Sequence, residues 1–184
     1  MARRSYVVAL AACIVAAFAI FRMTPTRAAD PSGPIYAQLS SPDTQDPKGT
    51  DPLLVQMTSN DALGGLGHDE KAKTTDVVVK TAGVYFMVAA IQVGKDSGAG
   101  GDYLDVWMKQ NGKDVDNSGC RQVIHDPKYT TVLVCQGIAE CKAGDTFNVA
   151  ISASSAGKGI GIKAIKPKGE PLIPSIIFSM YKIN

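Results

Sequence analysis

Histidines beside carboxylates are the first residues of this chain to consider as ligands of a metal ion. The two histidines, His68 and His125, each stand beside carboxylates, in "HDE" and "HDP". Neither stretch has the ligand spacing of a known zinc motif. We therefore interpret both as solvated loop residues and predict no metal site at either one.

The segment after Gly112 alternates oxygen-bearing side chains, at Asp114, Asp116 and Ser118. This spacing invites comparison with a calcium loop, but the twelfth position counted from Asp114 holds His125 where a bidentate Glu should stand. Alternate residues of a strand share one face, so a solvated outer row is the favoured interpretation. Asp114 and Asp116 stay weak calcium candidates, and no other cofactor is predicted.

The serines and acids of the chain do not form a recognisable catalytic pattern. No serine lies in a Gly-x-Ser-x-Gly turn, and no histidine has a strand-end context that ties it to a serine. The acids cluster in turns, where the paired carboxylates of a glycosidase are not expected. We predict that the protein is not an enzyme, and a hydrolase with an unrecognised site is the second alternative.

Three cysteines follow the N-terminal segment, at positions 120, 135 and 141. Cys135 and Cys141 are six residues apart on one expected strand, so they cannot bond to each other unless that strand bends. A Cys120–Cys135 disulfide is the favoured pairing, which leaves Cys141 as a small buried hydrophobe. The connectivity itself cannot be deduced from the sequence.

Residues 1–29 have the order of a secretory signal, with Arg3-Arg4, an apolar run over residues 6–21 and small residues at Ala28-Ala29. Cleavage would make the protein secreted or periplasmic, exposed in the cell envelope. An uncleaved segment would anchor it through a helix over residues 6–21, which is the only membrane contact that we expect. The remaining chain has 15 basic and 17 acidic residues and no basic stripe, so nucleic-acid binding is not predicted.

Residues 30–52 are rich in Pro, Ser, Thr and Asp and are interpreted as a flexible lead-in that includes a first short strand. The main domain is expected over residues 53–184, or from about residue 34. Residues 59–75 form a Gly-rich, charged connection. From residue 76 onward, apolar runs of strand length alternate with turn residues every ten residues or so. This spacing predicts an all-β protein, an antiparallel sandwich or barrel.

Two of the expected strands show clear alternation. In "YLDVWMKQNG", Leu104, Val106 and Met108 share one face and should point into the core. Tyr103 and Trp107 lie on the opposite face, where large aromatics are either interface residues or are covered by a loop. The dipeptide Asn111-Gly112 predicts a hairpin turn.

In "CKAGDTFNVAIS", the Gly144-Asp145 turn should precede a strand whose residues Phe147, Val149 and Ile151 face the core. Downstream, "SAGKGIGIKAIKPKG" over residues 155–169 is interpreted as a long, mobile, basic loop.

The order of these motifs resembles the globular domain of the complement 1q and tumour necrosis factor superfamily. The resemblance rests on Gly83 with Tyr85, Asn111-Gly112, Gly144-Asp145, and Phe178 with Tyr181 in "PSIIFSMYKI". It implies a jelly roll of two antiparallel sheets and a homotrimer packed about a three-fold axis. No collagen-like stalk precedes the domain. The oligomer-interface candidates are Tyr103, Trp107 and Tyr181.

These observations predict a non-catalytic binding or structural module that contacts protein or glycan through loops at one end. The family resemblance implies that this module is a homotrimer. The alternative is a monomeric carbohydrate-binding sandwich, which needs an aromatic platform on an exposed sheet face. The sequence does not identify the ligand.

Overall fold

The computed structural model describes residues 33–184, which form two antiparallel sheets and contain no helix. The predicted all-β sandwich is therefore confirmed for this part of the chain. The expected signal or anchor helix of residues 1–29 lies outside the described residues. Within residues 33–184, no segment has the length and apolar character of a membrane-spanning helix.

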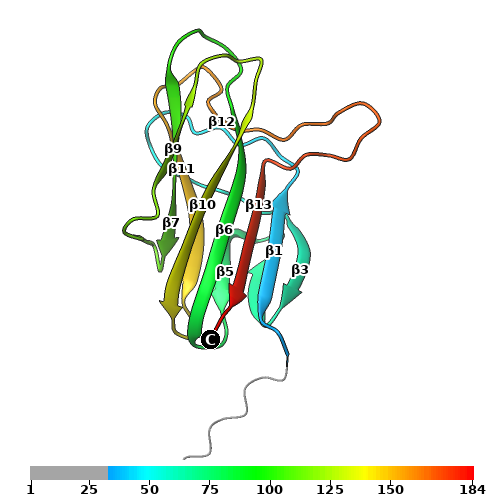
Figure 1. Cartoon of the computed structure of the whole chain (residues 1–184), viewed down its shortest axis with the longest axis vertical. Helices are drawn as coiled ribbons and strands as arrows, with labels where there is room; N and C mark the ends of the chain where they lie inside the picture. The colour runs from blue at the N-terminus through cyan, green and yellow to red at the C-terminus, as the bar shows by residue number, and fades with distance from the viewer. Residues whose placement is uncertain (1–32) are drawn as a thin grey trace, which may run out of the picture. The chain divides into compact units, whose positions relative to one another are not determined.

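The first sheet, sheet A, has the strand order β10-β6-β13-β1-β3, and the short strand β12 pairs with β6. Figure 1 shows these five long strands side by side. Their bounds are β1 Tyr36–Ser41, β3 Ser59–Gly64, β6 Gly83–Gly94, β10 Thr131–Cys141, β12 Gly161–Ile162 and β13 Ile176–Lys182. Strand β1, expected within a flexible lead-in, is an internal strand that pairs with both β13 and β3.

The second sheet, sheet B, has the order β4-β5-β11-β7-β8, with β2 paired to β11 and β9 paired to β7. Its strands are β2 Leu53–Leu54, β4 Leu66–Asp69, β5 Lys73–Val79, β7 Asp102–Gln110, β8 Lys113–Asp114, β9 Cys120–Ile124 and β11 Thr146–Ala153. The chain changes sheet eight times, after β1, β2, β3, β5, β6, β9, β10 and β11. Most neighbours in a sheet are therefore distant in sequence.

The core lies between the two sheets and is built from alternate residues of their strands. Leu104, Val106 and Met108 of β7 are buried, and so are Phe147, Val149 and Ile151 of β11, as the alternation predicts. Tyr85, Phe147 and Phe178 are the largest of these buried side chains. The Tyr85 hydroxyl donates a hydrogen bond to the carbonyl of Thr81 at 2.7 Å, which satisfies its polar end.

Both predicted turns are present. Asn111 and Gly112 have φ values of 52° and 75° and join β7 to β8, as a tight hairpin requires. Asp145 accepts hydrogen bonds from the Lys142 amide and from the side chains of Gln110 and Asn111. These bonds lower the pKa of the Asp145 carboxyl from its usual value, the Lys142 amide contributing most. Asp145 is therefore a structural turn residue.

Two sequence interpretations of loops are wrong. The segment 59–75, expected as a connection, contains β3, β4 and the start of β5. Residues 155–169, expected as a mobile loop, contain β12 together with the buried side chains of Ile160, Ile162 and Lys163. Lys163 forms ion pairs with Asp46 at 2.8 Å and Asp96 at 3.0 Å. Lys158 pairs with the largely buried Asp102 at 2.7 Å, so two of the four lysines of this segment are held by carboxylates, whereas Lys166 and Lys168 are exposed.

Candidate functional site

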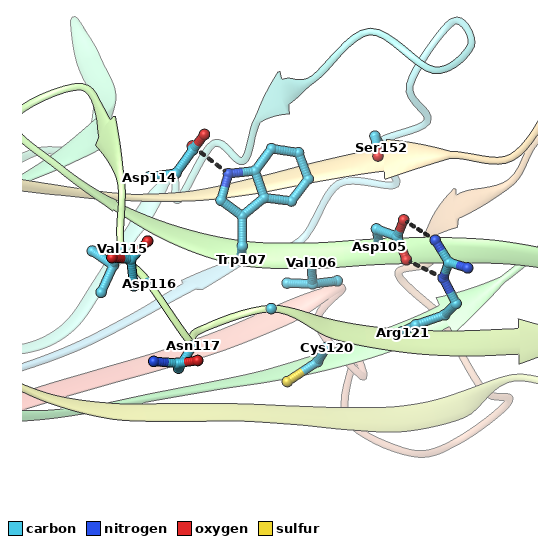
Figure 2. Close-up of a pocket in the computed structure, with 11 residues that line it drawn as sticks. Asp105, Val106, Trp107, Asp114, Val115, Asp116, Asn117, Cys120, Arg121 and Ser152 are labelled. Atoms are coloured by element: carbon cyan, nitrogen blue, oxygen red, sulfur yellow. Dashed lines mark hydrogen bonds and ion pairs between the residues drawn. The ribbon is translucent and has the colours of Figure 1, made fainter.

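A groove of about 580 Å³ lies on the outer face of sheet B, the face turned away from the core. We call it the sheet B groove. It is lined by β7, by the segment from Asp114 to Arg121, and by Ser152 of β11. Figure 2 shows the indole of Trp107 beside Asp114, with Asp105 farther along β7 and bound to Arg121 of the neighbouring strand β9. The groove thus combines one large aromatic ring with several polar side chains, and Val106, Val115 and Cys120, which belong to the core or pack against it, complete its lining.

Trp107 is held in place from two directions. Its indole Nε1 donates a hydrogen bond to Asp114 Oδ1 at 2.7 Å, and the Lys109 ammonium also contacts this oxygen. Ala150 pairs with Trp107 across the β7–β11 ladder and faces outward, yet it is fully buried. Because Leu54 and Trp107 flank Ala150 in register, we infer that these side chains cover it and that the half-buried indole rests on the sheet.

The other end of the groove carries a planar ion pair. Arg121 donates from Nε and Nη2 to the two oxygens of Asp105, at 2.6 and 2.7 Å. Its guanidinium also lies 3.8 Å from the centroid of the Tyr103 ring. The Asp105 carboxylate, through these hydrogen bonds, is the main cause of the raised pKa of Arg121. The pair is exposed, so it orients the guanidinium more than it stabilises the fold.

The outer face of sheet A is apolar over several neighbouring strands. Ile138, Phe86, Tyr181 and Tyr36 occupy one cross-strand row, on β10, β6, β13 and β1. The rings of Phe86 and Tyr181 lie 5.4 Å apart, centroid to centroid. Ile138, Tyr181 and Tyr36 are 64%, 45% and 40% exposed. We call this surface the sheet A face.

A second apolar row lies beyond a mixed row of Gln136, Val88, Ser179 and Gln38. Val134 of β10, Ala90 of β6 and Ile177 of β13 lie in register, and Val134 and Ile177 are 50% and 39% exposed. Among the outward-facing residues of β10, β6 and β13, Glu140 alone is charged. The outer faces of antiparallel sheets that meet water are usually polar, so this composition is typical of a covered surface.

No protein-family model matches the chain, and no curated protein matches it either. The site must therefore be interpreted from its own geometry.

The three interface candidates from the sequence lie on two different faces. Tyr181 belongs to the sheet A face, whereas Tyr103 and Trp107 lie on the outer face of sheet B. Tyr103 contacts Arg121, and Trp107 is bonded to Asp114. A single flat interface cannot contain all three residues.

The predicted row of Asp114, Asp116 and Ser118 is only partly correct. Asp114 and Asp116 are exposed, but Ser118 is buried and its hydroxyl binds the backbone of Met108 and Val115. Strand β8 ends at Asp114, so the three residues do not share a strand. Lys109 and then Trp107 lower the pKa of Asp114. Calcium binding at Asp114 and Asp116 stays a prediction, and residues 33–184 hold no group of three or more His, Cys, Asp or Glu side chains placed for a metal.

His68 is not the solvated loop residue expected from the sequence. It lies on β4, and its ring nitrogens approach Asn60 Oδ1 at 2.7 Å and the Thr74 carbonyl at 3.3 Å. His125 is exposed between β9 and β10. Within residues 33–184, neither ring is hydrogen-bonded to a serine.

The three cysteines of the described residues are free thiols, so the expected Cys120–Cys135 disulfide is not formed in the structure. The Cys120 Sγ lies 3.8 Å from the carbonyl oxygen of Val134, and the Cys135 Sγ lies 4.0 Å from the carbonyl oxygen of Val106. Cys141 is buried, as predicted. Burial raises the pKa of the Cys135 thiol, with a further contribution from Cys120. It also raises the pKa of Cys141, to about 11.

Sequence reasoning named one residue of the sheet A face, Tyr181, and named Trp107, Asp114 and Asp116 of the sheet B groove. It missed the other residues of the sheet A face and the role of Arg121 in the groove. The sheet A face could have been found, because "VYFMVAAIQV" is apolar at odd and even positions alike and therefore predicts a strand covered on both sides. The pairing of Asp105 with Arg121 had no such signal. It depends on the register between β7 and β9, which only the fold reveals.

Proposed function

We propose that this protein is a non-catalytic binding module that assembles as a homotrimer through the sheet A face. The observation that carries the proposal is the apolar row of Ile138, Phe86, Tyr181 and Tyr36, in which Phe86 is half-buried and the other three side chains are exposed. Adjacent exposed apolar side chains of this kind are typical of an interaction surface. Exposed aromatic and aliphatic side chains near the centre of a sheet are the kind of residue that anchors protein interfaces.

The occupant of the sheet A face is a second copy of the chain. Because the face has almost no charge, it offers no electrostatic signal for a differently charged partner, whereas like apolar rows pack on one another. Strand β10 adds to this, since it is an eleven-residue edge strand that exposes Val132, Val134 and Ile138. Long apolar edge strands associate unless an assembly covers them.

The proposed number of chains in the assembly, three, comes from the resemblance to a family of trimeric proteins. Strands that alternate between two sheets, with β10, β6, β13 and β1 adjacent in one of them, support a jelly roll like that of the complement 1q and tumour necrosis factor superfamily. The resemblance implies packing about a three-fold axis. We place the protein outside the cytoplasm, secreted or in the cell envelope, on the signal-like order of residues 1–29.

The test is the mass of the protein after substitution of Ile138 by lysine. Full burial of an isoleucine side chain contributes about 1.5–3 kcal/mol, so Ile138, which is 64% exposed, contributes about 1–2 kcal/mol per protomer. Over three copies the loss is about 3–6 kcal/mol, or two to four orders of magnitude in the trimer dissociation constant. A buried, unpaired lysine increases this loss.

Light scattering during size-exclusion chromatography should find the unaltered protein at three times the chain mass and the Ile138→Lys variant at one. The matched control is Val123→Lys, which changes an exposed apolar residue of similar size on the outer face of sheet B. The control should stay trimeric. Equal masses for both variants would refute the sheet A face as the interface, and a monomeric unaltered protein would favour the monomeric carbohydrate-binding alternative.

A further inference from the structure

We propose that the sheet B groove binds a neutral saccharide, with Trp107 as the stacking platform and Asp116, Asn117 and Arg121 as hydrogen-bonding groups. The inference rests on the proposed function as a binding module and assigns its ligand class. The groove lies on the outer face of the sheet opposite the sheet A face. Assembly through the sheet A face therefore leaves the groove open to solvent.

The platform is pre-organised. The hydrogen bond to Asp114 fixes the rotation of the indole, and the buried Ala150 beneath it stops the ring from sinking into the sheet. One side of the ring is thus supported by protein, and the half-buried ring keeps part of its surface in the groove. A flat apolar surface of this kind suits the C–H face of a pyranose ring, and its rigidity limits the entropy lost on binding.

Polar groups near the platform are free for a ligand. Asp116 and Asn117 are exposed, and within residues 33–184 neither side chain makes a hydrogen bond. Arg121 uses Nε and Nη2 for Asp105, which leaves Nη1 to donate. A sugar hydroxyl both donates and accepts, so it is matched by a carboxylate, an amide and a guanidinium placed together.

The charges of the groove favour a neutral ligand. Asp105 is paired with Arg121, and Asp114 with Lys109, so the unpaired carboxylate of Asp116 leaves a small negative excess. This excess disfavours the phosphates of nucleic acids and the carboxylates of acidic polysaccharides. The volume of about 580 Å³ is within the usual range of small-ligand sites.

Trp107 is the only tryptophan of the chain, so its fluorescence reports on the groove alone. The experiment titrates the protein, purified after expression of the full chain, with neutral hexasaccharides of glucose, mannose, xylose and N-acetylglucosamine, and with a hexagalacturonate as the acidic probe. We expect a saturable change in emission with at least one neutral hexasaccharide. If none of them gives a saturable change up to millimolar concentrations, or if only the acidic probe binds, the proposal is overturned.

Calorimetry then measures the affinity of variants for the saccharide that binds. Trp107→Ala should weaken binding about tenfold or more, whereas Trp107→Phe should keep part of the affinity. Trp107→Ala removes a side chain that covers Ala150, so variants at exposed residues are needed as well. Asp116→Ala and Asn117→Gly serve this purpose, and each should weaken binding. Glycine is chosen at position 117 because Asn117 has a φ of 60°, which alanine adopts only with strain. The control is Tyr129→Phe, an exposed aromatic outside the groove.

Unchanged affinity in all the groove variants would overturn the assignment of the site, even where a saccharide binds. The mass of each sample is measured at the same time, because the two proposals fail separately. Loss of the trimer with retained saccharide binding refutes only the sheet A interface. A stable trimer without saccharide binding refutes only the groove.

Discussion

Gly161 lies against the segment of Gln45 and Asp46, where there is no space for a side chain. A Cβ atom at Gly161 would stand 2.2 Å from Asp46 Oδ1, 2.4 Å from the Gln45 carbonyl oxygen and 2.8 Å from Asp46 Cα. Two of these three atoms belong to the backbone. The segment cannot move away, because Gln45 and Ile162 exchange two backbone hydrogen bonds of 2.9 Å each.

Gly161→Ala should therefore destabilise the fold. Insertion of a methyl group into a filled site usually costs about 1–3 kcal/mol, and here a shift of Asp46 would also disturb its ion pair with Lys163, whose side chain is 10% exposed. We expect a loss of about 2 kcal/mol. With a typical urea dependence of roughly 2 kcal/mol per molar, the midpoint of unfolding falls by about 1 M.

The assay follows Trp107 fluorescence in urea at one fixed protein concentration, since assembly couples stability to concentration. Gly101→Ala is the matched control, because a Cβ atom there would meet only Val123 Cγ1, at an ordinary 3.7 Å. Its stability should stay within about 0.5 kcal/mol of the unaltered protein. A Gly161→Ala midpoint equal to that of Gly101→Ala would refute the close packing of residues 155–169 on this segment.

Further predictions concern buried charges and thiols. Lys95→Met removes a fully buried ammonium that binds Asp102 at 2.9 Å, while Lys158 still binds Asp102 at 2.7 Å. The unfolding free energy at pH 7 should therefore fall by about 2 kcal/mol in urea denaturation, the usual size of a lost hydrogen bond to a charged group. Lys158 and then Lys95 lower the pKa of Asp102 to about 2. The contribution of these ion pairs to the unfolding free energy is therefore complete above about pH 4 and should disappear as the pH falls toward 2. A stability difference between Lys95→Met and the unaltered protein that does not shrink between pH 4 and pH 2 would contradict this prediction. Alkylation of the native protein at pH 8, mapped by peptide mass, should modify Cys120 well before Cys135 and Cys141, because burial raises the pKa of the last two thiols. If Cys120 and Cys135 do not react even after denaturation, they form a disulfide instead.

The sequence predicts the local parts of this fold well. Strands β7 and β11 alternate with a period of two and end in recognisable turns, so the buried positions of Leu104 and Phe147 could be named before the structure was known. Such patterns need only neighbouring residues. Each side chain reports its own face because the pleat places successive residues on opposite sides.

Contacts between distant segments could not be predicted in this way. Lys163 binds Asp46 across 117 residues of sequence, so nothing near either residue indicates the pair. The loop that holds Lys163 therefore resembled a mobile basic segment. The same limit applies to Asp105 and Arg121, which meet only because β9 pairs with β7 in one register.

The separation of the aromatic residues shows a further limit. Tyr103, Trp107 and Tyr181 all point away from the core, and a single sequence does not tell which sheet carries each one. Once the sheets are assigned, the sheet A face and the sheet B groove become two surfaces with different chemistry. One is nearly free of charge, and the other combines an indole with fixed polar groups.

The central claim is that the sheet A face is covered by two further copies of the chain. Sedimentation equilibrium of the unaltered protein over a range of micromolar concentrations tests it most directly, because the method gives mass without reference to shape. We predict a single species at three times the mass of the purified chain. A species at the mass of one chain throughout that range would contradict the claim.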